Sequence, residues 1–156
     1  MLNIYIDADA CPVKKEVYRV ADRFKLKTIL VSNKDIRIPD SSLITSVVVD
    51  DSPDAADNWI AENAAEGDIV VTGDIPLADR SLKKGAGVIS STGKLFTEDN
   101  IGQLIATRNL MADLRDAGEI SGGPAPYKKK DRSNFLQKLD ELIHSIINKY
   151  PDYSIH

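Results

Sequence analysis

Short apolar runs alternate with amphipathic stretches over the first 90 residues of the chain. The apolar runs have the length and β-branched content of strands and cover residues 2–6, 28–31, 47–49, 69–72 and 87–90. The stretches between them place apolar residues at helical spacing and cover residues 12–24, 54–65 and 77–83. Strands that alternate with helices predict an α/β fold with a mainly parallel central sheet.

The rest of the chain is predicted to be helical. Thr97 is a residue type that caps helix starts and Gly118 one that ends helices, so a helix is expected between them. A second helix has its apolar stripe over residues 135–147, and the composition of 118–132 predicts a mobile loop before it. The stripe of the last helix could pack on the sheet of its own chain or on a second subunit. A homodimer therefore stays an open alternative.

Length and composition indicate one domain over residues 1–156, with an α/β core over 1–96 and C-terminal helices over 97–156. Hydrophobic residues make up 42% of the chain, enough for one core. No window approaches the roughly 18 apolar residues of a membrane span. Cys11 is the single cysteine, which fits a reducing compartment, so we expect a cytoplasmic protein. Without a neighbouring histidine, Cys11 is expected to pack rather than to act as a nucleophile.

The net charge of −4 hides a gradient along the chain. Residues 1–79 carry 8 Lys and Arg against 15 Asp and Glu, whereas residues 80–156 carry 12 against 9. An acidic half followed by a mildly basic half would suit a polyanion laid across an acidic site, because phosphate contacts come from Lys and Arg. The overall acidity argues against indiscriminate binding of nucleic acid.

Aspartates gather where three of the predicted strands end. The three clusters are Asp7 with Asp9, then Asp50, Asp51, Asp54 and Asp57, then Asp74. Loops at the carboxyl edge of an open α/β sheet converge on one crevice, so these carboxylates are expected to meet. Converging carboxylates repel one another and need a cation, and oxygen ligands without His or Cys favour Mg²⁺ or Mn²⁺.

Each candidate ligand has a plainer alternative. Asp9 could only cap the next helix, and Asp54 could only charge the first turn of its own helix, with Asp57 on the same face. Asp79 could lie on a solvated helix face. Asp7 and Asp74 are the stronger candidates, because Asp7 ends an apolar strand and Asp74 lies just beyond one. Asp74 also follows Thr-Gly, where a small residue lets the backbone approach a ligand.

Basic residues near these clusters could hold a polyanion. Lys14 and Lys15 follow the first cluster, and Arg80 follows Asp79; solvated surface is the alternative for them. Lys128, Lys129 and Lys130 come after Tyr127, a composition that can hold a nucleic-acid backbone with one stacking ring. Short lysine runs can also be merely solubilising.

Four segments carry a resemblance to a known family. They are IYIDADACPVKKEVYRVADR at 4–23, DAADNWIAE at 54–62, DIVVTGDIPLADRSLKKGA at 68–86 and GGPAPYKKKDRSNF at 122–135. Together they closely resemble the bacterial YaiI/YqxD family, which is grouped with PIN-like nuclease folds. The resemblance spans almost the whole chain. It implies a PIN-like three-layer α/β/α domain with a helical C-terminal extension.

The resemblance also implies a chemistry. In PIN-like nucleases acidic residues follow the first strand, sit on a middle helix and follow a Thr/Ser-x-Asp segment. By that pattern Asp7, Asp54 and Asp74 correspond to the catalytic metal ligands. The supplementary ligands would be Asp9, Asp57 and Asp79. The implied activity is a nuclease that uses Mg²⁺ or Mn²⁺ and acts on RNA.

Two alternatives stay open. Haloacid dehalogenase phosphatases share several of these residue types, and in that case Asp7 would attack phosphorus and Asp9 would be the general acid. Ser32, Gly73, Asp74 and Asp79 would complete that set. No lysine lies between Lys34 and Lys83 to fill the usual position before Gly-Asp, which counts against this alternative. The other alternative is a module that binds metal or RNA without catalysis.

Overall fold

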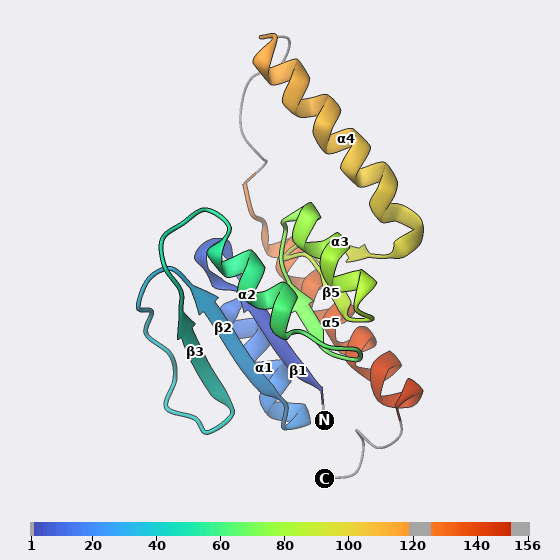
Figure 1. The fold of residues 1–156 in the computed structure, drawn as a ribbon. Coiled ribbons are helices and arrows are strands. Elements are labelled where there is room, and N and C mark those ends of the chain that lie inside the picture. Colours follow the sequence, from blue (N-terminus) through green and yellow to red (C-terminus); the bar gives the residue numbers. More distant parts are fainter. Residues whose placement is uncertain (1, 119–125, 151–156) are drawn as a thin grey trace.

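The computed structural model describes residues 2–118 and 126–150 of the chain. The strands are β1 (Asn3–Asp7), β2 (Lys27–Ser32), β3 (Ile44–Val48), β4 (Ile69–Val71), β5 (Gly87–Ile89) and β6 (Leu95–Phe96). The helices are a short 3-10 turn η1 (Ala8–Ala10), then α1 (Lys14–Phe24), α2 (Ala55–Asn63), α3 (Ile75–Lys83), α4 (Glu98–Asp116) and α5 (Lys129–Lys149). Figure 1 shows how they are arranged.

The strands form one six-stranded sheet in the order β3-β2-β1-β4-β5-β6. All neighbours are parallel except β5 and β6, which are antiparallel. At the centre, Tyr5 of β1 lies between Ile29 of β2 and Val70 of β4. Parallel strands covered on both faces are usually almost wholly apolar, and β4, with three buried apolar residues, has that composition.

Helices cover both faces of the sheet, giving three layers (Figure 1). On one face, α1 and α5 bury Val17, Val20, Phe135 and Leu139 against strand residues such as Ile4. On the other face, Ile60 of α2 and Leu77 of α3 pack in a second apolar cluster that includes Tyr5, Val31 and Val70. Successive strand residues point to opposite faces, so Ile4 and Tyr5 belong to different clusters. The predicted α/β/α architecture is therefore confirmed.

The two C-terminal helices differ in how they pack. The stripe of α5 lies on its own sheet, because Phe135, Leu139 and Ile143 are fully buried there. At the start of α4, Ile101 is buried against the α2 and α3 layer, whereas Leu110 further along is 57% exposed and the helix projects from the body (Figure 1). Within residues 2–118 and 126–150, no helix is long and apolar enough to cross a membrane.

The predicted ends of α4 are confirmed in physical detail. The Thr97 hydroxyl accepts a hydrogen bond from the backbone N–H of Asn100 at 3.2 Å. The Asn100 side chain accepts one in return from the Thr97 N–H at 2.9 Å. This reciprocal capping box satisfies two donors that a helix start otherwise leaves open. At the other end Gly118 has φ of 75°, a conformation that glycine adopts without strain.

Two sequence-based boundaries are wrong. The predicted mobile loop over 118–132 extends too far, because 129–132 form the first turn of α5. Asp131 favours this early start, since its carboxylate accepts from the backbone N–H of Lys128 at 3.0 Å. Residues 119–125 of that loop lie outside the described residues. At the other edge, β3 is longer than predicted and occupies Ile44–Val48. The two-residue strand β6 was not predicted.

Candidate functional site

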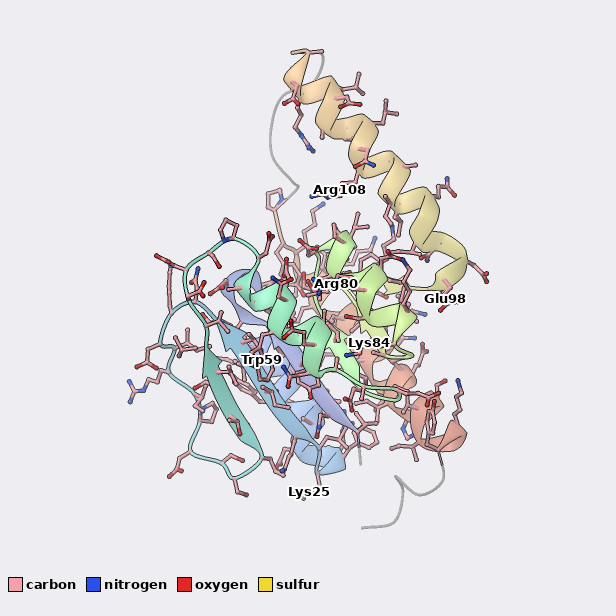
Figure 2. The ribbon with its side chains drawn as sticks, in the orientation of Figure 1. Lys25, Trp59, Arg80, Lys84, Glu98 and Arg108 are labelled. Carbon is pink, nitrogen blue, oxygen red and sulfur yellow. The ribbon has the colours of Figure 1, made fainter. Side chains whose placement is uncertain are left out.

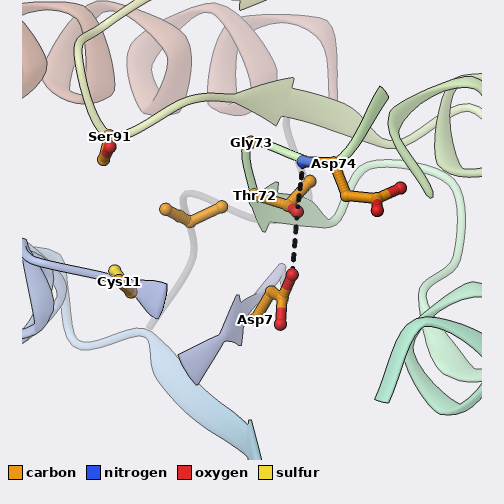
Figure 3. A pocket seen from close by; sticks show the side chains of 7 residues that line it. Asp7, Cys11, Thr72, Gly73, Asp74 and Ser91 are labelled. Carbon is orange, nitrogen blue, oxygen red and sulfur yellow. Dashed lines mark hydrogen bonds between the residues drawn. The ribbon is translucent and has the colours of Figure 1, made fainter. Parts of the chain in front are cut away.

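The candidate site lies where the connections of the sheet change direction. Strands β1 and β4 are neighbours, but β1 leads into α1 on one face and β4 leads into α3 on the other. In open α/β sheets such a switch point opens a crevice beyond the carboxyl ends of the strands. Here a cavity of about 330 Å³ occupies that position (Figure 3). Its lining residues are Asp7, Cys11, Val71, Thr72, Gly73, Asp74 and Ser91.

Thr72 connects the two strand ends. Its hydroxyl donates a hydrogen bond to the Asp7 carboxylate at 3.1 Å and accepts one from the backbone N–H of Asp74 at 3.0 Å (Figure 3). Only 4% of Thr72 is exposed, so water competes weakly for these bonds. The hydroxyl thus fixes the orientation of Asp7 from the neighbouring strand.

Asp74 has a structural task as well as its place in the cavity. Its carboxylate accepts a hydrogen bond from the Leu77 N–H at 2.8 Å and so caps α3. Gly73, just before it, lies in the cavity wall. A Cβ added at Gly73 would meet no atom within 4 Å. Close packing therefore does not demand glycine here; the missing side chain leaves room in the cavity.

The carboxyl group of Asp7 has a raised pKa. Burial is the main cause, because removing water disfavours the charged form. The hydrogen bond from Thr72 opposes this, while the nearby charges of Asp74 and Asp9 raise the pKa further.

Asp57, on the first turn of α2, belongs to the same electrostatic group. Its pKa is raised to about 6, first by burial and then by the charges of Asp74, Asp7 and Asp54. Arg80 of α3 works in the other direction. The charges of Asp7 and Asp74 therefore act on Asp57. Two carboxylates that are far apart in sequence, Asp7 at the end of β1 and Asp74 beyond β4, therefore line one cavity, and both act electrostatically on Asp57 of α2.

Asp54 and Asp79 lie at the margin of this group. Asp54 is exposed at the start of α2 and makes no side-chain capping bond, and its charge raises the pKa of Asp57. Asp79 on α3 pairs with Lys83 at 3.0 Å, so its charge is engaged outside the cavity. Asp50 instead accepts bonds from Ser52 in a turn, which lower its pKa.

Asp9 is held by the end of β2. Its carboxylate accepts hydrogen bonds from the Ser32 hydroxyl and, at 3.2 Å, from the backbone N–H of Asn33. The phosphatase alternative needs Asp9 as a general acid and Ser32 at the substrate phosphate. In this structure the two side chains bind each other.

The basic residues that the sequence predicts to contact a polyanion lie at three separate positions in the structure. Arg80 donates to the Asn58 side chain at 2.8 Å and lies between α3 and the start of α2 (Figure 2). Lys14 and Lys15 line a separate hollow beside Cys11. The three lysines are exposed at the start of α5: Lys128, Lys129 and Lys130.

Tyr127, the predicted stacking ring, is already engaged. Its hydroxyl donates to the Ser91 carbonyl at 2.7 Å, and its ring faces the Arg132 guanidinium at 5.8 Å. It therefore braces the loop that carries Ser91 against the start of α5.

The donor chemistry of the cavity fits a hard divalent cation, but the spacing limits how it could be held. Within residues 2–118 and 126–150, no three His, Cys, Asp or Glu side chains form a ready metal cluster. Asp74, turned to cap α3, explains part of this. Mg²⁺ commonly keeps several waters and binds through only one or two carboxylates. The site therefore fits a largely hydrated ion better than a fully protein-ligated one.

Sequence reasoning did not single out several residues of the site. The role of Thr72 could have been suspected, because a hydroxyl at the end of β4 stands beside Asp7 once the strands are neighbours. Ser91 and Asn58 gave no signal, since their places depend on how a loop and a helix pack.

The fold and the cavity define the class: a three-layer α/β protein with an acidic pocket at its topological switch point. Within that class, the chain belongs to the YaiI/YqxD family, because the family model described as "Uncharacterized BCR, YaiI/YqxD family" matches residues 5–145. The resemblance seen in the four sequence segments is thereby confirmed.

Relatives support the same assignment. A UPF0178 protein of Rhodospirillum rubrum is 52% identical over 146 residues, covering 93% of this chain and 97% of the relative. A UPF0178 protein of Azorhizobium caulinodans is 56% identical over 142 residues, covering 91% of this chain and 89% of the relative. No solved structure matches the chain.

Proposed function

We propose that this protein is a metal-dependent nuclease that hydrolyses phosphodiester bonds of RNA. The observation that carries the proposal is that Asp7 and Asp74, from the ends of neighbouring strands, line one pocket, with Asp7 oriented by the Thr72 hydroxyl. Burial first, and then the negative charges of Asp74, Asp7 and Asp54, raise the pKa of Asp57 to about 6. A divalent cation would relieve that repulsion.

Asp7 is the residue that would hold Mg²⁺ or Mn²⁺ directly, because it lines the pocket and its orientation is fixed. Asp74 lines the same pocket, and Asp57 and Asp54 would add negative charge to its surroundings. Such an ion, when bound, supplies an activated water and neutralises charge on phosphate oxygens. Thr72 keeps Asp7 from rotating away, and Gly73 leaves space for the substrate phosphate.

A phosphodiester substrate agrees better with the site than a small phosphomonoester. The phosphatase alternative would need Asp9 and Ser32 free for catalysis, whereas their side chains bind each other. A nuclease needs neither residue in that role. RNA is the substrate that the family resemblance implies.

The test is cleavage of single-stranded and structured RNA by the purified full chain with Mn²⁺. We expect cleavage that Asp7→Asn abolishes, together with Mn²⁺ binding by calorimetry that the same substitution weakens. Asp22→Asn is a matched control, because Asp22 is an exposed carboxylate paired with Lys25 on α1. Wild-type protein inert on both RNAs, with no Mn²⁺ binding sensitive to Asp7→Asn or Asp74→Asn, would contradict the proposal. RNA binding without turnover would indicate the non-catalytic module, and Asp7-dependent hydrolysis of para-nitrophenyl phosphate would indicate the phosphatase.

A further inference from the structure

A second hollow lies beside the acidic pocket. It has a volume of about 440 Å³ and is lined by Cys11, Pro12, Lys14, Lys15, Glu16 and Arg132. Cys11 also lines the acidic pocket, so the two cavities share a wall. The residues come from the start of α1 and the start of α5, elements that are neighbours on the same face of the sheet (Figure 1).

The charge of this hollow is opposite to that of the pocket. Three cationic side chains line it against one carboxylate, Glu16. Glu16 pairs with Arg132, its Oε1 lying 3.0 Å from the guanidinium Nε, while the ring of Tyr127 lies on the same guanidinium. These contacts place Arg132 at the hollow. Over the described part of the chain, Lys14 and Lys15 have no carboxylate within ion-pair distance, so their charges are uncompensated.

The start of α1 adds backbone donors to these side chains. Val13, at the N-cap position, makes no side-chain capping bond, so the first N–H groups of α1 lack that partner. Helix starts with open N–H groups favour anions, and nearby lysines strengthen the preference. The hollow therefore combines a helix start, two unpaired lysines and an oriented arginine.

We propose that this basic hollow binds a substrate phosphate other than the one at the acidic pocket, so the substrate is a single-stranded polynucleotide rather than a mononucleotide. This inference rests on the proposed function. One phosphate would sit at the carboxylates with the help of a cation, and another would sit on Lys14, Lys15 and Arg132 without one. The uncharged thiol of Cys11, whose pKa burial raises to about 11, separates the two.

Binding without cleavage tests the hollow. We would measure fluorescence anisotropy of a labelled uridine octanucleotide and dinucleotide with the full chain in EDTA, so that no divalent ion is present. The double substitution Lys14→Ala with Lys15→Ala should weaken octanucleotide binding roughly tenfold, about the effect of one charged hydrogen bond. It should also reduce the slope of log K against log salt by about 0.7 for each phosphate that the variant no longer neutralises. The matched control, Lys27→Ala with Lys83→Ala, removes two exposed lysines elsewhere on the chain and should leave binding unchanged.

A gain-of-affinity variant excludes misfolding as the explanation. Glu16→Gln keeps an oxygen that can accept from the Arg132 Nε but removes the one carboxylate that, among the residues the structure describes, lines the hollow. Octanucleotide binding should tighten several-fold. The dinucleotide, too short to engage both cavities fully, should respond less to every substitution.

The outcomes separate this inference from the proposed function. If the lysine pair and Glu16→Gln leave octanucleotide affinity and salt slope unchanged, the hollow is not a phosphate site, even if Asp7-dependent cleavage occurs. If both variants shift the octanucleotide affinity as expected but the protein does not cleave RNA with Mn²⁺, the hollow is a phosphate site and the nuclease proposal is wrong. Equal cleavage of dinucleotide and octanucleotide would also overturn the polynucleotide inference.

Discussion

Replacing Thr72 by valine tests the contact that orients the acidic site. Valine has nearly the same shape but lacks the hydroxyl that joins Asp7 to the backbone of Asp74. Hydrogen bonds to charged groups contribute about 1.5–3 kcal/mol, and neutral ones about 1 kcal/mol. Because Asp7 is only partly buried, water replaces part of the missing interaction. We therefore expect the free energy of unfolding to fall by about 2–3 kcal/mol.

The assay is urea unfolding followed by circular dichroism, with Thr72→Ser as the matched control. Serine keeps the hydroxyl and lacks one methyl group, which costs about 1 kcal/mol. The pH dependence gives a second check. Thr72 lowers the pKa of Asp7, so the advantage of the wild type over Thr72→Val should be full above the higher pKa that Asp7 has in the variant and shrink as the pH falls toward the pKa that it has in the wild type. Equal stability of the valine and serine variants, at neutral pH, would refute the reasoning.

Substitutions can also test three further features: the raised pKa of Asp57, the backbone conformation of Gly93 and the lysine run at 128–130. Asp57 has a folded pKa of about 6, above its ordinary value of 3.8, so its contribution to stability is full below pH 3.8 and is lost as pH rises through 6. Asp57→Asn should therefore be more stable than wild type at pH 8 by about 1 kcal/mol, after allowance for solvent screening. Thermal unfolding at pH 5 and pH 8 measures this gain in stability. A gain that is no larger at pH 8 than at pH 5 would contradict the expectation. Gly93→Ala should lower the free energy of unfolding by more than about 1 kcal/mol, because the φ of Gly93 is 88° and an added Cβ would lie 2.9 Å from the Asn134 backbone. In Gly73→Ala the added Cβ would meet no atom within 4 Å, so this variant should unfold at the same urea concentration as the wild type. Replacing Lys128, Lys129 and Lys130 by alanine should weaken RNA binding and flatten its salt dependence in the anisotropy assay, and an unchanged salt slope would show them to be merely solubilising.

The sequence was sufficient for the layout of the fold, because strand and helix periods alternate clearly over residues 1–90. The pattern also predicts that Asp7 and Asp74 lie at one edge of the sheet, since Asp7 ends one apolar strand and Asp74 lies just beyond another, and these strands are neighbours. The family membership could likewise be identified from the motifs.

What the sequence could not reveal depends on contacts between distant segments. Asp9 is two residues from Asp7, yet the η1 turn carries it toward Ser32 on β2. No local pattern specifies that direction. The sequence indicated only part of the basic hollow, namely Lys14 and Lys15. Arg132 reaches the hollow from the first turn of α5, a segment that the composition predicts to be a loop. The strand β6 has two residues and pairs only through its position beside β5.

Cys11 gives the molecule a natural position for a reporter group. It is the only cysteine of the sequence, and it forms part of the wall between the two cavities. A single fluorinated or spin label could therefore be attached without removing any other thiol. Because burial raises the pKa of this thiol to about 11, the thiolate is scarce at neutral pH and labelling would require alkaline conditions. Spectra of the labelled protein would then distinguish a cation entering on one side from an anion entering on the other.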